Sequence, residues 1–207
     1  MTIPNRNFNY PTAIKFGAGR IRELADHCRA NGIVRPLFVT DPGLVAMPMV
    51  KAIIDDVKRA GLGIAVFSDV RANPVEANVL AGVKAYRAGN HDGVVAFGGG
   101  SALDIGKMVA LMHGQHLSVF ELEDVDDWWT RADSSKISPI IAVPTTAGTG
   151  SEVGRAGVVT HPVTHEKMAC GDPKSTFRIA LLDPVVTVSQ PRPLTAITGY
   201  DALSHAV

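Results

Sequence analysis

The feature that most constrains the fold is a regular alternation between short apolar runs and longer segments with helical periodicity. The apolar runs are PLFVT (36–40), GIAVF (63–67), GVVAF (93–97), SPIIAVP (138–144) and FRIALLD (177–183). Segments 19–32, 49–61 and 101–112 carry apolar residues at helical spacing. A further helix is expected with Asn73 as its N-cap, Pro74 as its first helical residue and Glu76 closing a capping box. Because helices of this length connect parallel strands, the pattern predicts an α/β fold with a parallel sheet and right-handed crossovers.

Composition removes several classes of function. Of the 207 residues, 46% are hydrophobic, and 20 lysines and arginines balance 20 aspartates and glutamates. A net charge of zero gives no electrostatic reason to expect nucleic acid or an anionic membrane as a partner. No apolar run has the length of a membrane span, and residues 1–12 lack the pattern of a secretory signal. With only Cys28 and Cys170, no disulfide framework is expected, and a reducing cytoplasm is the predicted location.

The pattern changes after residue 113. Segment 121–136 is acidic and contains Trp128 and Trp129, which indicates a surface loop or, alternatively, a lid or partner-contacting segment. Segments 153–161 and 166–170 flank a turn at Pro162 and predict a β-hairpin. New helices are expected at the end of the chain. We therefore place a domain boundary near residue 188, with domains at 1–188 and 189–207.

A glycine-rich turn between a strand and a helix is the strongest local signal. In VVAFGGGSALDIGK (94–107) the apolar strand ends in Gly98, Gly99 and Gly100, and Ser101 opens a helix. Three glycines allow a ligand to approach the backbone without a Cβ in the way, and the free N–H groups of a helix start suit a phosphate. The segment matches neither the Walker loop nor the GxGxxG fingerprint. A tight turn without a ligand is the alternative.

An aspartate follows the first buried strand. Asp41, in FVTDPGL (38–44), lies where ligands of parallel sheets bind, and its carboxylate could accept hydrogen bonds from an adenosine ribose while repelling a 2′-phosphate. The alternative is an ordinary turn aspartate before Pro42 and Gly43. The acidic residue precedes the glycine loop here, whereas in the common dinucleotide fold it follows, so we expect a different topology.

Hydroxyls follow the next strand. Thr145, Thr146, Thr149 and Ser151 alternate with small residues in PTTAGTGSE (144–152). That composition suits a polar floor for a cofactor, although by itself it describes only a loop of small residues.

Two groups of metal-ligating residue types stand in the second half. Asp201 and His205 in TGYDALSHAV (198–207) are four apart, so a helix would present both on one face, either as half of a divalent-metal site or as a solvated pair. His161, His165 and Cys170 flank the predicted hairpin turn. Nothing completes a tetrahedral set there, so we expect surface residues.

GGGSALDIGK, TTAGTGSE and TGYDALSHAV, in this order and at this spacing, resemble the iron-containing alcohol dehydrogenase family (group III). The resemblance runs from the strand before Phe16 to the last residue. It implies a Rossmann-like nucleotide-binding domain with a β-hairpin, followed by the start of an all-helical domain, with a metal in the cleft between the two.

The resemblance also implies roles for individual residues. Asp41 would contact the adenosine ribose, and Lys167 on the hairpin would face the cofactor. The dinucleotide site would be lined by Asn73, Gly98, Gly99, Gly100, Ser101, Thr145, Thr146 and Thr149. Asp104 and Lys107 match the family motif GGGSxxDxxK, without an assigned task. Asp201 and His205 would be the first two metal ligands, the other two being histidines of the helical domain beyond residue 207.

The implied activity is hydride transfer between a primary or secondary alcohol, or its aldehyde or ketone, and NAD(H), with Fe²⁺ or else Zn²⁺ as the metal and a homo-oligomer as the assembly. Alternatives within the resemblance are a glycerol dehydrogenase, a maleylacetate reductase and a dehydroquinate-synthase-like lyase. An alternative of another class is a nucleotide-binding fragment without catalysis.

Overall fold

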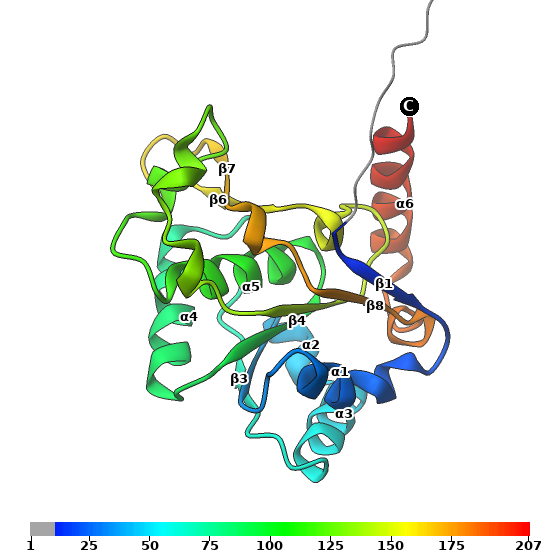
Figure 1. Ribbon diagram of the computed structural model, residues 1–207. Coiled ribbons are helices and arrows are strands. Elements are labelled where there is room, and N and C mark those ends of the chain that lie inside the picture. The colour runs from blue at the N-terminus through cyan, green and yellow to red at the C-terminus, as the bar shows by residue number, and fades with distance from the viewer. Residues whose placement is uncertain (1–10) are drawn as a thin grey trace, which may run out of the picture.

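The computed structural model describes residues 11–207 and contains a six-stranded parallel sheet in the order β1-β8-β5-β4-β2-β3 (Figure 1). Its strands are β1 (Ala13–Phe16), β2 (Pro36–Thr40), β3 (Ala65–Phe67), β4 (Gly93–Gly98), β5 (Ile140–Pro144) and β8 (Ile179–Leu182). The helices are α1 (Leu24–Ala30), α2 (Pro42–Val45), α3 (Pro48–Arg59), α4 (Glu76–Ala88), α5 (Gly100–Met112) and α6 (Arg192–Ala206). The predicted α/β fold with a parallel sheet is confirmed.

Alternating side chains of the central strands build a core on each face of the sheet. Val94 and Ala96 of β4 face the cluster formed with α4 and α5, whereas Val95 and Phe97 face the cluster formed with α1 and α3. Every residue of β2, β4 and β5 is buried. The continuous apolar runs in the sequence therefore belong to strands that are covered on both faces.

The strand order reverses between β2 and β4. From β2 the chain first adds β3 on one side, then crosses back to place β4 on the other side, followed by β5 and β8. Thr40, the last residue of β2, pairs with Phe97 of β4, so Asp41 and Gly98 leave the sheet side by side. This is the crevice where open parallel sheets bind ligands, and it explains why the aspartate precedes the glycine loop in this chain.

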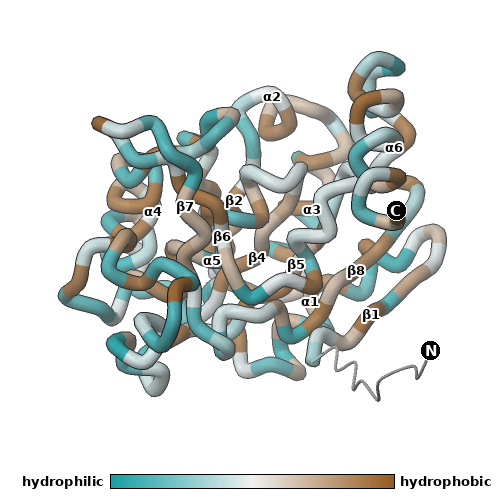
Figure 2. Tube along the Cα trace, turned by 90° about the horizontal axis from the view of Figure 1, so that it is seen from above, coloured by the Kyte–Doolittle hydropathy of each residue, from teal (hydrophilic) through white to brown (hydrophobic). Residues whose placement is uncertain are grey.

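A two-stranded antiparallel hairpin lies over α5, beside the carboxyl edge of the sheet. It consists of β6 (Ala156–Thr160) and β7 (Lys167–Gly171), as the turn at Pro162 predicts. Helix α6 stands away from the body in Figures 1 and 2, and the described part of the chain buries none of its residues. The boundary near residue 188 and the separate helical domain stay predictions.

Two local expectations were wrong. Helix α4 begins at Glu76 with Val75 as its N-cap, and not at Pro74 with Asn73 as its N-cap, because Asn73 has φ 53° and Val75 pairs with Thr160 of the hairpin. The side chain of Asn78 accepts a hydrogen bond from the Val75 N–H at 3.1 Å and so caps this helix. The expected helix over 19–32 is split into a 3₁₀ turn and the shorter α1.

The remaining segments also differ in detail. The strand expected over 63–67 is reduced to β3 at an edge of the sheet. Segment 119–136 is a series of 3₁₀ turns, with the Arg131 guanidinium 4.1 Å from the ring centre of Trp128.

The prediction that residues 1–12 are not a secretory signal falls mostly on residues 1–10, which lie outside the described residues. In residues 11–207 no helix combines the length and the apolar character that crossing a membrane requires.

Candidate functional site

The crevice between β2 and β4 joins the predicted ribose aspartate to the glycine loop. Gly98 has φ 148°, and a Cβ built on it would lie 2.5 Å from Oδ2 of Asp41 and 2.7 Å from Cβ of Ala102. Only glycine fits this position. Burial raises the pKa of the Asp41 carboxyl above its ordinary value, while the Gly99 backbone N–H opposes that shift. The structure therefore brings together Asp41 and the start of α5, which the sequence separates by nearly sixty residues.

The three glycines have different environments. A Cβ on Gly100 would lie 2.9 Å from Cγ2 of Thr149, which is too close, whereas a Cβ on Gly99 would meet Thr146 at an ordinary 3.6 Å. Gly99 is the N-cap of the 13-residue helix α5, and its φ of −76° suits any residue. The turn itself therefore requires Gly98, whereas Gly100 leaves room for the Thr149 side chain. The backbone at Gly99 faces open space, through which a ligand could approach.

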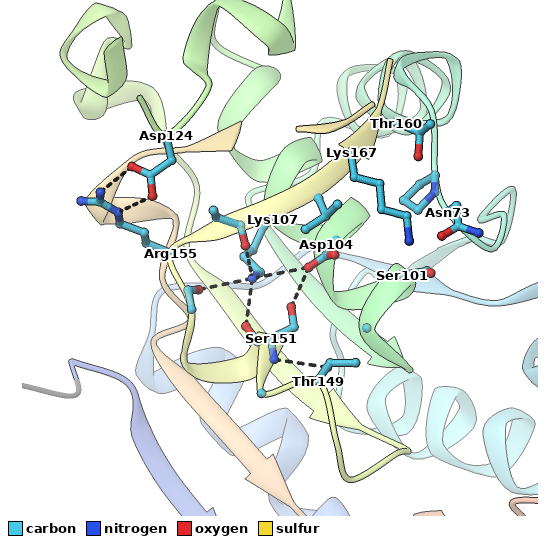
Figure 3. Close-up of a pocket in the computed structure, with 16 residues that line it drawn as sticks. Asn73, Ser101, Asp104, Lys107, Asp124, Thr149, Ser151, Arg155, Thr160 and Lys167 are labelled. Atoms are coloured by element: carbon cyan, nitrogen blue, oxygen red, sulfur yellow. Dashed lines mark hydrogen bonds and ion pairs between the residues drawn. The ribbon is translucent and has the colours of Figure 1, made fainter. Parts of the chain in front are cut away.

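A cavity of about 530 Å³ extends from the start of α5 to the hairpin (Figure 3). Its wall is formed by the Asn73 turn, the first turns of α5, the loop after β5 and the hairpin. The predicted cofactor residues that line it are Asn73, Gly100, Ser101, Asp104, Thr149 and Lys167. The other five are Asp41, Gly98, Gly99, Thr145 and Thr146, and they lie at the strand ends beside it.

The loop after β5 connects these two groups. The Thr145 N–H donates to the carbonyl oxygen of Gly98 at 2.9 Å, which fixes the loop against the glycine turn. Thr145 is buried, whereas Thr149 is exposed to the cavity. Thr149 thus has a hydroxyl that a ligand could reach, and Thr145 has a structural position.

Lys107 has a task that the sequence did not reveal. Its ammonium group is fully buried and donates to the carbonyl oxygens of Ser151, Gly154 and Ala156 at 2.9, 3.3 and 2.6 Å (Figure 3). Asp104, one helical turn earlier, lies 3.6 Å from the same nitrogen and accepts a hydrogen bond from the Ser151 hydroxyl at 2.7 Å. The available signal was the spacing of three between Asp104 and Lys107, which are the only charged residues of α5.

The predicted metal ligands form a pair on α6. Oδ1 of Asp201 lies 3.4 Å from Nε2 of His205, and both side chains are partly exposed. They offer one carboxylate and one imidazole on the same helix face, which fits part of an Fe²⁺ or Zn²⁺ coordination sphere. Within residues 11–207, no three or more His, Cys, Asp or Glu side chains gather closely enough to hold a metal.

The loop after β5 touches the helix that carries this pair. A Cβ on Gly148 would lie 2.6 Å from the carbonyl oxygen of Thr198 and 3.1 Å from Oδ2 of Asp201. The glycine allows α6 to approach the loop closely. As a result, the candidate metal pair lies at one end of the loop whose other residues line the candidate cofactor cavity.

The histidines of the hairpin do not form a competing centre. The His161 ring packs on Phe120 with the ring centres 4.8 Å apart. Cys170 is buried, and burial raises the pKa of its thiol to about 12, which disfavours the thiolate form that binds metals.

Comparison with known proteins identifies the family. The family model described as iron-containing alcohol dehydrogenase matches residues 11–184, well over half of the chain. The chain belongs to the iron-containing alcohol dehydrogenase family. A choline dehydrogenase of Bacillus subtilis (strain 168) is 36% identical over 200 residues, which cover 97% of this chain and 49% of the relative. An NAD-dependent methanol dehydrogenase of Bacillus methanolicus is 32% identical, over 97% of this chain and 51% of the relative.

A solved member of the family has the same architecture. The sulfoacetaldehyde reductase from Bifidobacterium kashiwanohense, in complex with NAD⁺, superposes with a TM-score of 0.87 at 33% identity, covering 97% of this chain and 52% of the other. The predicted Rossmann-like domain with its hairpin is thereby confirmed for this iron-containing alcohol dehydrogenase family member. The chain spans about half the length of the relatives it matches.

Proposed function

We propose that this chain is the dinucleotide-binding portion of an NAD(H)-dependent oxidoreductase that interconverts small primary or secondary alcohols with their aldehydes or ketones. A divalent metal completes the site, with Fe²⁺ as the preferred ion and Zn²⁺ as the alternative. The observation that carries the proposal is the contact of Gly148 with α6, because it joins a dinucleotide crevice and a metal-ligating pair through one loop.

The dinucleotide would lie across the carboxyl edge of the sheet. The adenosine ribose is assigned to Asp41, and the pyrophosphate to the glycine turn and the free N–H groups of α5, whose dipole favours negative charge. From there the cofactor extends into the cavity of about 530 Å³, past Thr149 and Lys167. The Lys167 ammonium would add a second positive contribution to the field around the phosphates.

Asp201 and His205 would hold the metal. When bound, a divalent ion supplies Lewis acidity to an alcohol oxygen. The role of this chain's own residues is positional: the loop at 145–149 keeps the dinucleotide in place at one end and contacts α6 at the other. Such positioning accelerates a reaction because the reactants have already lost their translational and rotational freedom on binding.

The cofactor preference follows from the charge of Asp41. A 2′-phosphate at about 4 Å from a carboxylate, at an effective dielectric constant of about 20, is repelled by roughly 4 kcal/mol per pair of unit charges. Solvent screening at this half-buried position reduces that figure. We therefore propose NAD(H) over NADP(H).

Substitution of Asp41 by Asn tests the cofactor assignment. The wild-type chain should bind NADH more tightly than NADPH, and Asp41→Asn should reduce that preference at least about tenfold, equivalent to about 1.4 kcal/mol. Fluorescence titration with both cofactors measures this. Asp55→Asn, on an exposed part of α3, is the matched control and should leave the preference unchanged.

Turnover separates the enzyme from the nucleotide-binding fragment. Two ligands leave most of a metal's coordination sphere to water, so the 207-residue chain should bind NADH, hold metal loosely and oxidise no alcohol. The same sequence within a protein of its relatives' length should reduce NAD⁺ with ethanol or propanediol once Fe²⁺ or Zn²⁺ is present. A wild-type chain that binds neither cofactor would contradict the proposal. Absence of turnover in the longer protein would leave only the binding function.

A further inference from the structure

Lys107 is the only buried lysine in the described part of the chain, and it lies directly beneath the candidate cofactor cavity. Its neighbours are three backbone carbonyl oxygens, the Asp104 carboxylate and, at 5.5 Å from the nitrogen to the ring centre, the apolar ring of Phe177. Burial of an ammonium group costs several kcal/mol unless its hydrogen bonds are satisfied. The question is therefore what the buried ammonium group of Lys107 contributes at this place.

The geometry matches the charged form of the side chain. An ammonium group has three N–H donors, and the three carbonyl oxygens provide three acceptors. A neutral amine has two donors and would turn its lone pair toward one of these oxygens. Burial lowers the pKa of Lys107, and the Asp104 carboxylate opposes that shift. The three acceptors and Asp104 together favour the positive charge in place.

The three carbonyls belong to two walls of the cavity. Ser151 and Gly154 are in the loop after β5, where the Ser151 N–H donates to the Thr149 hydroxyl oxygen at 3.3 Å. Ala156 begins β6, whose last residue, Thr160, pairs with Lys167 on β7. A single ammonium group on α5 is thus bonded to the loop that carries Thr149 and to the hairpin that carries Lys167.

Close packing makes this connection stiff. A Cβ on Gly157 of β6 would lie 2.9 Å from the backbone oxygen of Asp104, so the hairpin lies directly on α5. The Asp104 carboxylate holds the Ser151 hydroxyl on the same side (Figure 3). Loss of the ammonium group would remove one donor from each of three carbonyl oxygens between these tightly packed surfaces, and the Ser151 oxygen would keep only the Gly154 N–H at 3.3 Å.

We propose that Lys107 is a positioning residue, which holds Thr149 and Lys167 at the spacing that the nicotinamide half of the dinucleotide requires. The inference rests on the proposed binding of NAD(H). Among the described residues, no hydrogen bond or ion pair links Asp41 or Gly98 directly to Lys107, Asp104 or Ser151, so the binding of the adenosine half should depend much less on this network.

The test compares Lys107→Met with a variant that weakens the fold without touching the network. Val109→Ala shortens a buried side chain of α5 that packs toward Gly82 of α4. NADH and AMP affinities are measured by fluorescence and calorimetric titration, with thermal unfolding alongside. We expect Lys107→Met to weaken NADH binding at least about tenfold while AMP affinity changes less than about twofold. Val109→Ala should lower the unfolding temperature and leave both affinities unchanged.

The outcomes separate this inference from the proposed function. If the wild type binds NADH and Lys107→Met binds it equally well, or if Val109→Ala loses NADH affinity to the same degree, the positioning role is wrong and the function stands. If the wild type binds no NADH, the proposed function itself fails. Should Lys107→Met not fold, Asp104→Asn decides: faster amide exchange over residues 149–157 with weaker NADH binding supports the role, and unchanged exchange overturns it.

Discussion

At the scale of single residues, the glycine turn shows how close packing assigns different roles to identical residues. Gly98 combines a positive φ with a direct approach to Asp41 and Ala102, and Gly100 lies against Thr149. Gly99 has an ordinary backbone conformation and free space around it. The sequence presents the three as equal candidates for a phosphate cradle. The structure makes Gly98 necessary for the turn and places Gly100 against the Thr149 side chain, and it leaves open space at Gly99, where a ligand could approach the backbone.

Alanine substitutions should separate these roles. Gly98→Ala should destabilise the fold by about 1–3 kcal/mol, because its left-handed backbone and the contact with Asp41 both oppose a Cβ. Gly99→Ala should leave stability within about 0.5 kcal/mol of wild type while weakening NADH binding. Chemical denaturation and NADH titration measure the two effects. Equal stability losses at both positions would contradict the assignment.

At the scale of elements, α6 is held to the body by few contacts. Its exposed apolar side chains are Leu194, Ile197, Tyr200 and Leu203. The Gln190 side chain donates to the Thr198 hydroxyl at 3.1 Å, and Gly148 touches the helix near Asp201. A 15-residue helix without an extensive packed face is marginally stable in water. The position of the candidate metal pair therefore depends strongly on the Gly148 contact.

Two glycine-to-alanine substitutions should have opposite effects on the stability of α6. Gly148→Ala should displace the helix, because the new Cβ would meet the Thr198 carbonyl at 2.6 Å. Gly199→Ala should stabilise the helix by up to about 1 kcal/mol, because a Cβ on Gly199 meets nothing within 4 Å among the described residues. Hydrogen exchange of the α6 amides should become faster in the first variant and slower in the second, with the sheet amides unchanged. Slower exchange in Gly148→Ala would show that the loop does not support the helix.

At the scale of the whole molecule, two cores on opposite faces of one sheet carry the stability, and each contains a buried thiol. Cys28 lies on α1, in the core that this helix forms with α3. Cys170 lies on β7, in the core that contains α4 and α5. Burial raises the pKa of both thiols from 9.0 to about 12. In the unfolded chain the thiols ionise near pH 9, whereas in the folded chain they stay protonated until about pH 12.

Stability should therefore fall as the pH rises from 9 toward 12. Over this range the unfolded state binds fewer protons than the folded state, so alkaline solution favours unfolding. Each thiol should account for about 1.4 kcal/mol of lost stability at pH 10. Urea unfolding at pH 8 and pH 10 measures the loss, and Cys28→Ala combined with Cys170→Ala should reduce it by roughly twice that amount. An identical loss in wild type and double variant would contradict the assignment.

The sequence by itself determined the class of fold and the position of the central elements. Strands β2, β4 and β5 are buried on both faces, so their residues are apolar apart from Thr40 at the end of β2, and their runs are recognisable at once. The hairpin was equally evident from its turn. Edge strand β3 and the start of α4 were placed less well, since an edge is only partly covered and the Val75 pairing with Thr160 is a contact between distant segments.

Only the tertiary structure decided how the candidate site is assembled. The motifs predicted which segments bear cofactor and metal residues, but not that Asp41 lies against Gly98, that Gly148 touches α6, or that Lys107 bonds to the loop and the hairpin at once. These contacts join residues many positions apart, and their energies depend on distances of a few tenths of an ångström. A local pattern of residue types contains no such distances; the crossing of the chain between β3 and β4 and the packing of the hairpin on α5 create them.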